Sequence, residues 1–201
     1  MKRLVLGLAA ALAVVTAPVS ALAAIVGQAA PDFSAPDLAG KAVKLSDFRG
    51  KFVVLEWTNP ECPYVRRHYD SGNMPSLQKE FAAKGVVWLA VNSSSPESGE
   101  FTPPDGMTKW VAAKGAAPTA VLIDKDGKVG RLYGARTTPH MYVIDPQGKL
   151  VYAGAIDDKR WANVEETKSA KNHVRAALGE AMAGKPVAVS ATTPYGCSVK
   201  Y

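Results

Sequence analysis

The 201-residue sequence contains only two cysteines, Cys62 and Cys197, and three histidines. Two cysteines allow at most one disulfide within the chain, which excludes a small fold held together by several disulfides. None of the histidines has a metal-ligand spacing to either cysteine, which argues against a zinc or copper site. The sequence therefore predicts neither a metal nor a cofactor.

Long runs of like charge and internal repeats are also missing. The chain has 24 Lys and Arg against 18 Asp and Glu, a formal net charge of +6, and the basic residues are scattered among acidic ones. Such a pattern is typical of a solvated mixed surface and does not favour nucleic acid as a partner. A chain of this length with 47% hydrophobic residues suits one packed domain.

Only the N-terminus has a long apolar run. The segment "MKRLVLGLAAALAVVTAPVSALA" (1–23) starts with Lys2 and Arg3, continues with an apolar core and ends with a small-x-small motif. These features predict a secretory signal peptide, because the apolar core is shorter than a typical membrane-spanning helix. Its removal would lower the net charge from +6 to +4, leave no other membrane-spanning segment and place the protein in an exported compartment, the bacterial periplasm.

The remaining residues alternate between strand and helix patterns. Continuous apolar runs predict buried strands at 52–57, 86–92 and 119–124, and "MYVID" and "KLVYAGA" around "PQG" predict an antiparallel hairpin. A further short hairpin is expected around 38–43. Helical spacing predicts helices at 63–70, 74–84, 107–115, 129–134 and 164–183. This order predicts an α/β sandwich with a mixed central sheet.

Cys62 follows the first buried strand directly and precedes a helix that begins at Pro63. Partial positive charge and free N–H groups at a helix N-terminus favour the thiolate, and Arg66 and Arg67 lie within the next turn. The carboxylate of Glu61 would oppose this effect. The alternative is a buried, inert cysteine that acts as a small hydrophobic residue.

A second feature is the Thr138-Pro139 step in "ARTTPHMYVID", directly before a predicted strand. Proline cannot donate a hydrogen bond to a sheet, and a cis peptide bond would explain its position here. An ordinary trans proline in a loop is the alternative.

Taken together, "APDFSAPDLAGKAVKLSDFRGKFVVLEW", "CPYV", "VVWLAVNSSS", "GAAPTAVLIDKDGKVGRLYGARTTPHMYVID" and "KLVYAGAIDD" resemble the thioredoxin superfamily. The similarity is to extracytoplasmic redoxin-type proteins, described as thioredoxin-like or as alkyl hydroperoxide reductase/thiol-specific antioxidant relatives. The resemblance implies a thioredoxin-like three-layer sandwich at 24–184, followed by a tail at 185–201. It also implies that Pro139 is cis and packs beside the reactive Cys62.

The sequence departs from both chemistries known in this superfamily. Thioredoxin-like oxidoreductases carry Cys-x-x-Cys at the strand-to-helix junction, and we match that motif to "NPEC", with Asn59 at the first cysteine position. Peroxiredoxins have a threonine or serine three residues before their cysteine, where Asn59 stands, and Thr58 is one residue too early. Their strand arginine corresponds to Pro139, with Arg136 nearby as a substitute.

Cys197 lies in the Pro- and Gly-containing tail, four residues before the last residue of the sequence. The fourteen residues from Ala183 to Cys197 span at most about 46–50 Å, so the tail can reach Cys62. We expect Cys197, on a mobile arm, to be the resolving or disulfide partner of Cys62. The alternative is that Cys197 is unpaired or bonds to another chain.

Three functions follow. The first is a thiol-disulfide oxidoreductase with Cys62 as nucleophile, an external thiol reductant and a protein or small-molecule disulfide as substrate. The second is a thiol peroxidase with antioxidant activity, in which peroxide oxidises Cys62 to a sulfenic acid and Cys197 condenses with it. The third is a redox-silent binding module that keeps the fold without the reaction.

Overall fold

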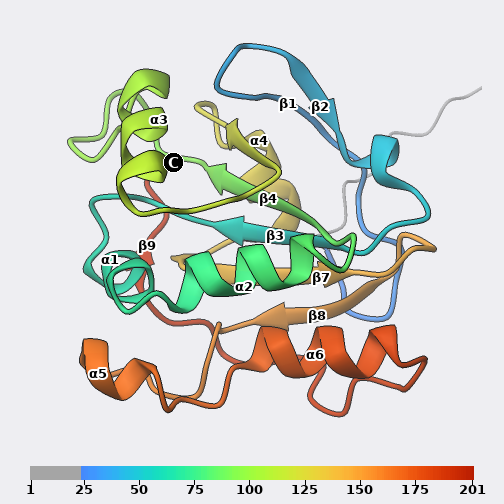
Figure 1. Ribbon diagram of the computed structural model, residues 1–201. Helices are drawn as coiled ribbons and strands as arrows, with labels where there is room; N and C mark the ends of the chain where they lie inside the picture. The colour runs from blue at the N-terminus through green and yellow to red at the C-terminus, as the bar shows by residue number, and fades with distance from the viewer. Residues whose placement is uncertain (1–23) are drawn as a thin grey trace, which may run out of the picture.

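In the computed structural model, which describes residues 24–201, a five-stranded mixed sheet forms the centre of the molecule (Figure 1). Parallel pairing joins β3 to β4 and β4 to β5, whereas β7 runs antiparallel to both β3 and β8. In the order β5-β4-β3-β7-β8, the strands are Ala120–Ile123, Val87–Asn92, Val53–Trp57, His140–Ile144 and Leu150–Gly154. The predicted mixed sheet is confirmed, and the predicted signal peptide lies outside the described residues.

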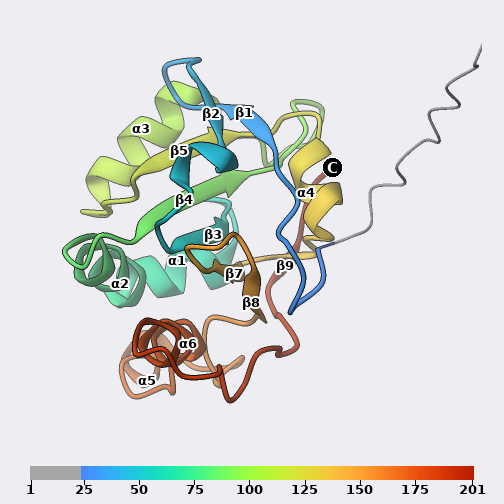
Figure 2. The ribbon, with the colours of Figure 1, turned by 90° about the vertical axis from the view of Figure 1, so that its right-hand side faces the viewer.

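Helices cover both faces of this sheet (Figure 2). One face packs against four helices, α1 (Pro63–Asp70), α2 (Asn73–Ala82), α3 (Pro104–Ala113) and α6 (His173–Met182). The other packs against α4 (Lys128–Tyr133), the short helix η1 (Leu45–Phe48) and the hairpin of β1 (Ser34–Pro36) and β2 (Ala42–Lys44). The result is the predicted three-layer arrangement.

The central strand β3 is buried on both faces, as its continuous apolar sequence predicts. Successive side chains of a strand point to opposite faces, so Val54 packs toward α1, α2 and α6, while Leu55 and Trp57 pack toward α4. The indole of Trp57 lies 5.6 Å from the ring of Tyr133 and 5.1 Å from the ring of Tyr142. The packing of Trp57 therefore fixes the end of β3, after which the turn that leads to Cys62 begins.

The predicted long helix at 164–183 is wrong, because the chain forms two shorter helices there. The first is α5 (Val164–Thr167), and the second, α6, begins with Asn172 as its N-cap, whose side chain accepts the N–H of Arg175 at 2.8 Å. Just before α6, the carbonyl of Lys171 accepts the N–H of Asp158 at 3.3 Å. The cap by Asn172 and the hydrogen bond between Lys171 and Asp158 separate α5 from α6, so no single helix runs through this segment.

The C-terminal residues run along the end of the sheet toward which β3 and β4 point (Figure 1). There β9 (Cys197–Ser198) pairs antiparallel with β6 (Thr137–Thr138), the short strand directly before Pro139. The sequence predicts a mobile arm at this place, and the structure shows a paired strand. Within residues 24–201, no helix combines the length and the apolar character needed to cross a membrane.

Candidate active site

Cys62 is the N-cap residue of α1 and follows a tight turn after β3. Asn59 builds that turn, because its side-chain oxygen accepts the N–H of Glu61 at 2.8 Å and its carbonyl accepts the N–H of Cys62 at 3.0 Å. Pro63 occupies the first helical position, where a missing N–H costs nothing. Arg66 points back along the turn and donates to the carbonyl of Glu61 at 2.8 Å.

The thiol of Cys62 is fully buried and lies against the loop before β7. Its Sγ donates a hydrogen bond to the carbonyl of Thr138 at 3.0 Å, and the Thr138–Pro139 peptide bond is cis. The structure thus brings together Cys62 and Thr138-Pro139, two features that are far apart in the sequence.

Cys197 lies beside the same loop. In the β6–β9 pair, Thr138 is the direct partner of Cys197, and the Cys197 side chain packs against the apolar cluster that contains Cys62. Burial, a hydrogen bond with the Cys62 side chain and the charge of Cys62 together raise the pKa of Cys197 to about 12. Both residues are free thiols in this structure.

The sequence prediction puts Asn59 at the first cysteine position of a Cys-x-x-Cys motif, and the structure offers a second position for the partner of Cys62. Asn59 lies ahead of the helix, and its side-chain amide donates to Ser94 at 3.2 Å and to Glu100 at 3.3 Å, which turns it toward the loop after β4. Val65, by contrast, lies in the first turn of α1, three residues after the N-cap, in the same apolar cluster as Cys62. Residues three apart share a helix face, so the vacant position is that of Val65.

Arg136, proposed as a peroxide-polarising residue, is exposed. Its guanidinium makes no hydrogen bond or ion pair with any residue between 24 and 201; its carbonyl accepts the N–H of Val199 at 3.1 Å. The buried guanidinium nearby belongs instead to Arg67, and it is already engaged by the carbonyls of Arg160 and Ala162, both at 2.8 Å. The arginine of a peroxiredoxin site thus has no clear counterpart beside Cys62.

Glu56 is a buried carboxyl group that the sequence analysis did not single out. It lies near the end of β3 and accepts hydrogen bonds from Tyr69 at 2.7 Å, Trp88 at 2.7 Å and Gln78 at 3.1 Å. Complete burial raises the pKa of Glu56 above its ordinary 4.5, although the three donors act in the opposite direction. Glu56 could have been found in the sequence as the one charged residue in an otherwise apolar strand.

A buried polar cluster on α1 was also missed. The hydroxyl of Tyr195 donates to Asp157 and accepts a hydrogen bond from Arg67 at 3.0 Å, and it lies 3.1 Å from Nε2 of His68. Burial and the neighbouring Arg67 charge lower the pKa of His68 to about 3, so this imidazole is neutral at pH 7. The cluster fastens the chain two residues before Cys197 to the helix that carries Cys62.

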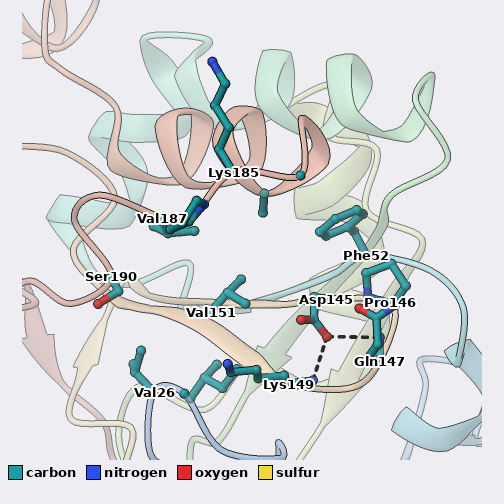
Figure 3. A pocket seen from close by; sticks show the side chains of 15 residues that line it. Val26, Phe52, Asp145, Pro146, Gln147, Lys149, Val151, Lys185, Val187 and Ser190 are labelled. Atoms are coloured by element: carbon teal, nitrogen blue, oxygen red, sulfur yellow. Dashed lines mark hydrogen bonds between the residues drawn. The ribbon is translucent and has the colours of Figure 1, made fainter.

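A pocket of the described residues lies away from this site. Its volume is about 510 Å³, and it lies between the end of α6, the start of β8 and the turn at 145–148 (Figure 3). Asp145 lines it, but its carboxylate is occupied by the N–H groups of Gln147 and Lys149 in that turn. Within residues 24–201, no three His, Cys, Asp or Glu side chains are grouped so that they could hold a metal ion.

Comparison with known proteins gives a family match for most of the described chain. Residues 26–153 match the AhpC/TSA family. The thiol-disulfide oxidoreductase ResA of Geobacillus thermodenitrificans (strain NG80-2) is 34% identical over 137 residues, which are 64% of this chain and 68% of ResA.

Solved structures show the same fold. A hypothetical protein from Sinorhizobium meliloti 1021 superimposes with a TM-score of 0.77 at 25% identity and covers 90% of this chain and 96% of its own. The thioredoxin domain of a thiol-disulfide oxidoreductase from Bacteroides vulgatus gives a TM-score of 0.52 at 24% identity, covering 64% of this chain and 87% of that domain. The predicted thioredoxin-like fold is therefore confirmed.

Proposed function

Because the chain belongs to the AhpC/TSA family and has a thioredoxin-like fold, we propose that it is a thiol-disulfide oxidoreductase whose redox couple is Cys62 and Cys197. The observation that supports this proposal is the pairing of Cys197 with Thr138, the same residue whose carbonyl accepts the hydrogen bond of the Cys62 thiol. Cys197 then takes the part that a second cysteine plays within a Cys-x-x-Cys motif.

The reaction consists of two exchanges. The thiolate of Cys62 attacks one sulfur of a substrate disulfide, that bond breaks, and a mixed disulfide forms while the first substrate thiolate leaves. Cys197 attacks the sulfur of Cys62 and releases the second substrate sulfur. Two electrons and the two thiol protons of the protein pass to the substrate, and the protein is left with a Cys62–Cys197 disulfide that an external thiol must reduce.

The surrounding residues have supporting roles in this scheme. Pro63 starts the helix whose N-terminus lies at Cys62, where the partial positive charge of the helix end favours the thiolate. Asn59 and Glu61 hold the turn in shape, while Thr138 and Pro139 form the wall against which both thiols lie. The high pKa of Cys197 keeps this residue a thiol until Cys62 has reacted.

We further propose that the protein works outside the cytoplasm, with 24–184 as the domain that carries the nucleophile and 185–201 as the tail that carries its partner. The basic and then apolar pattern of residues 1–23 supports export. Disulfide couples with structural or catalytic roles persist most readily in oxidising compartments such as the bacterial periplasm.

The test is reduction of a small peptide disulfide by the wild-type protein and by Cys62→Ser and Cys197→Ser variants. We expect Cys62→Ser to be inactive and Cys197→Ser to accumulate the mixed disulfide without turnover. If hydrogen peroxide oxidises Cys62 faster than it oxidises free cysteine, and the protein reduces no peptide disulfide, the result would indicate a thiol peroxidase instead. Full activity of Cys62→Ser would show that the nucleophile is wrongly assigned.

A further inference from the structure

The C-terminal residues cover the nucleophile. Cys62 is 0% exposed, and the segment that pairs with the neighbouring β6 is β9, which begins with Cys197. We call residues 197–201 the C-terminal strap. The Cys62 thiol donates its hydrogen bond to the carbonyl of Thr138, and Cys197, the first residue of the strap, packs against the apolar cluster that contains Cys62. Because Cys62 has no exposed surface, an external sulfur atom cannot reach it in this closed arrangement.

The far end of the strap is held by a few contacts, among them the half-buried Val199, which packs against the apolar cluster on the α4 face of the sheet. The N–H of Ser95 donates to the carbonyl of Lys200 at 2.6 Å, and the ammonium of Lys200 lies 3.0 Å from Glu100. Both members of that ion pair are about one-third exposed, and such pairs contribute little to stability. Segments with few buried apolar contacts open more easily than the rest of a fold.

Tyr201 provides the largest of these contacts. Its hydroxyl donates to the carbonyl of Ala135 at 2.6 Å, and the guanidinium of Arg131 lies 4.7 Å from the centre of its ring. Its ring rests on Gly127 and Gly130, where a side chain at either position would collide with it. Even so, Tyr201 is 41% exposed.

The near end of the strap is anchored much more firmly. Tyr195 is 6% exposed, and its hydroxyl is bound in the buried cluster with Asp157, Arg67 and His68. Between this anchor and the strap lies Gly196, whose φ of +137° is accessible to glycine and strained for other residues. A side chain on Gly196 would also collide with the carbonyl of Thr138.

We propose that residues 197–201 form a hinged strap that closes over Cys62 and opens by rotation at Gly196, while Tyr195 stays in place. Opening frees the edge of β6 and exposes the Cys62 thiol. Closing returns Cys197 to Cys62, so the strap both controls access to the nucleophile and delivers its partner. The purpose of this movement rests on the proposed function, but the movement itself is measured without any disulfide exchange.

The experiment uses Cys197→Ser as the background, so that iodoacetamide alkylates Cys62 alone. Its rate at pH 8 is measured in the folded protein, in urea, and after adding Tyr201→Ala or the control Val189→Ala. Val189 is 44% exposed and lies in the tail ahead of the Tyr195 anchor. We expect slow alkylation in the folded background, an increase of about tenfold with Tyr201→Ala, which corresponds to about 1.4 kcal/mol of lost strap contact, and no change with Val189→Ala.

A second variant ends the chain at Gly196 and removes the strap altogether, with an expected rate close to that in urea. If this shortened chain does not fold, the Tyr201→Ala comparison decides. Equal rates for Tyr201→Ala and Val189→Ala, or a folded background that reacts as fast as the chain in urea, would overturn the hinged strap. Faster alkylation in a protein that never reduces disulfides would keep the strap and reject the proposed function.

Discussion

At the scale of single residues, the chemistry depends on how the two thiols influence each other. The side chain of Cys62 adds to burial in raising the pKa of Cys197 to about 12. Cys62 is thus part of the environment of Cys197, although 134 other residues separate them in the sequence, from 63 to 196. No pattern within either segment could predict this effect.

Removal of the Cys62 side chain should therefore change the titration of Cys197. In Cys62→Ala the hydrogen bond and the negative charge are both lost, so the pKa of Cys197 should fall below that in the wild-type protein. The measurement is the rate of Cys197 alkylation from pH 7 to pH 11, followed by peptide mass. An unchanged pH profile would show that burial alone sets the reactivity of Cys197.

The vacant second cysteine position can be tested by filling it. In a Cys197→Ser background, Val65→Cys should form a disulfide with Cys62 on mild oxidation, because the two positions are separated by one helical turn. Asn59→Cys is the matched control and should give no such crosslink, since that side chain points toward Ser94 and Glu100. A crosslink in the Asn59→Cys protein and not in the Val65→Cys protein would support the match of the Cys-x-x-Cys motif to Asn59 and Cys62.

The buried carboxyl group of Glu56 predicts a pH-dependent stability. Its pKa is raised in the folded protein, so the folded state holds its proton more tightly than the unfolded chain does. The stabilisation is complete below the ordinary pKa of 4.5 and is lost as pH rises through the folded pKa. Unfolding in urea at pH 5 and pH 8 should show that Glu56→Gln gains stability relative to wild type over this interval. Parallel losses in both proteins would contradict the account.

At the scale of elements, much of the fold is predictable because it depends on local patterns. Continuous apolar runs predict β3 and β4, and the Gly- and Pro-containing interruptions predict where α1 ends and where the β7–β8 hairpin turns. The single helix predicted at 164–183 is wrong because the side chain of Asn172 caps a new helix there, which outweighs a continuous helical pattern. The β6–β9 pair escaped prediction because two residues in a strand carry too little signal, and their pairing depends on the completed fold.

The anchor of the C-terminal segment gives a prediction at this scale. Tyr195→Phe removes the hydroxyl that binds Asp157 and Arg67 and leaves a buried carboxyl group short of a donor, which should lower the free energy of unfolding by about 1–3 kcal/mol. Tyr64→Phe is the control, because the Tyr64 hydroxyl has no hydrogen-bond partner within residues 24–201. Urea unfolding of both variants gives the comparison, and equal losses would show that the cluster does not anchor the tail.

At the scale of the whole molecule, the thioredoxin-like fold supplies the helix terminus and the loop at Pro139, while the second thiol comes from the other end of the chain. The proposed role of Cys62 as nucleophile depends on the fold, because a helix begins at this residue. The tail explains how an α1 with Val65 in place of a second cysteine can still complete a disulfide exchange. The account therefore depends on Cys62 and Cys197 forming a bond within one chain.

Peptide mass mapping of the oxidised full chain under non-reducing conditions tests this dependence directly. After treatment with a small disulfide oxidant, the account predicts one crosslinked peptide pair that contains Cys62 and Cys197 from the same molecule. A reducing agent should separate the pair and restore both free thiols. Oxidised protein that retains two free thiols, or that links Cys197 only to a second chain, would contradict the central claim.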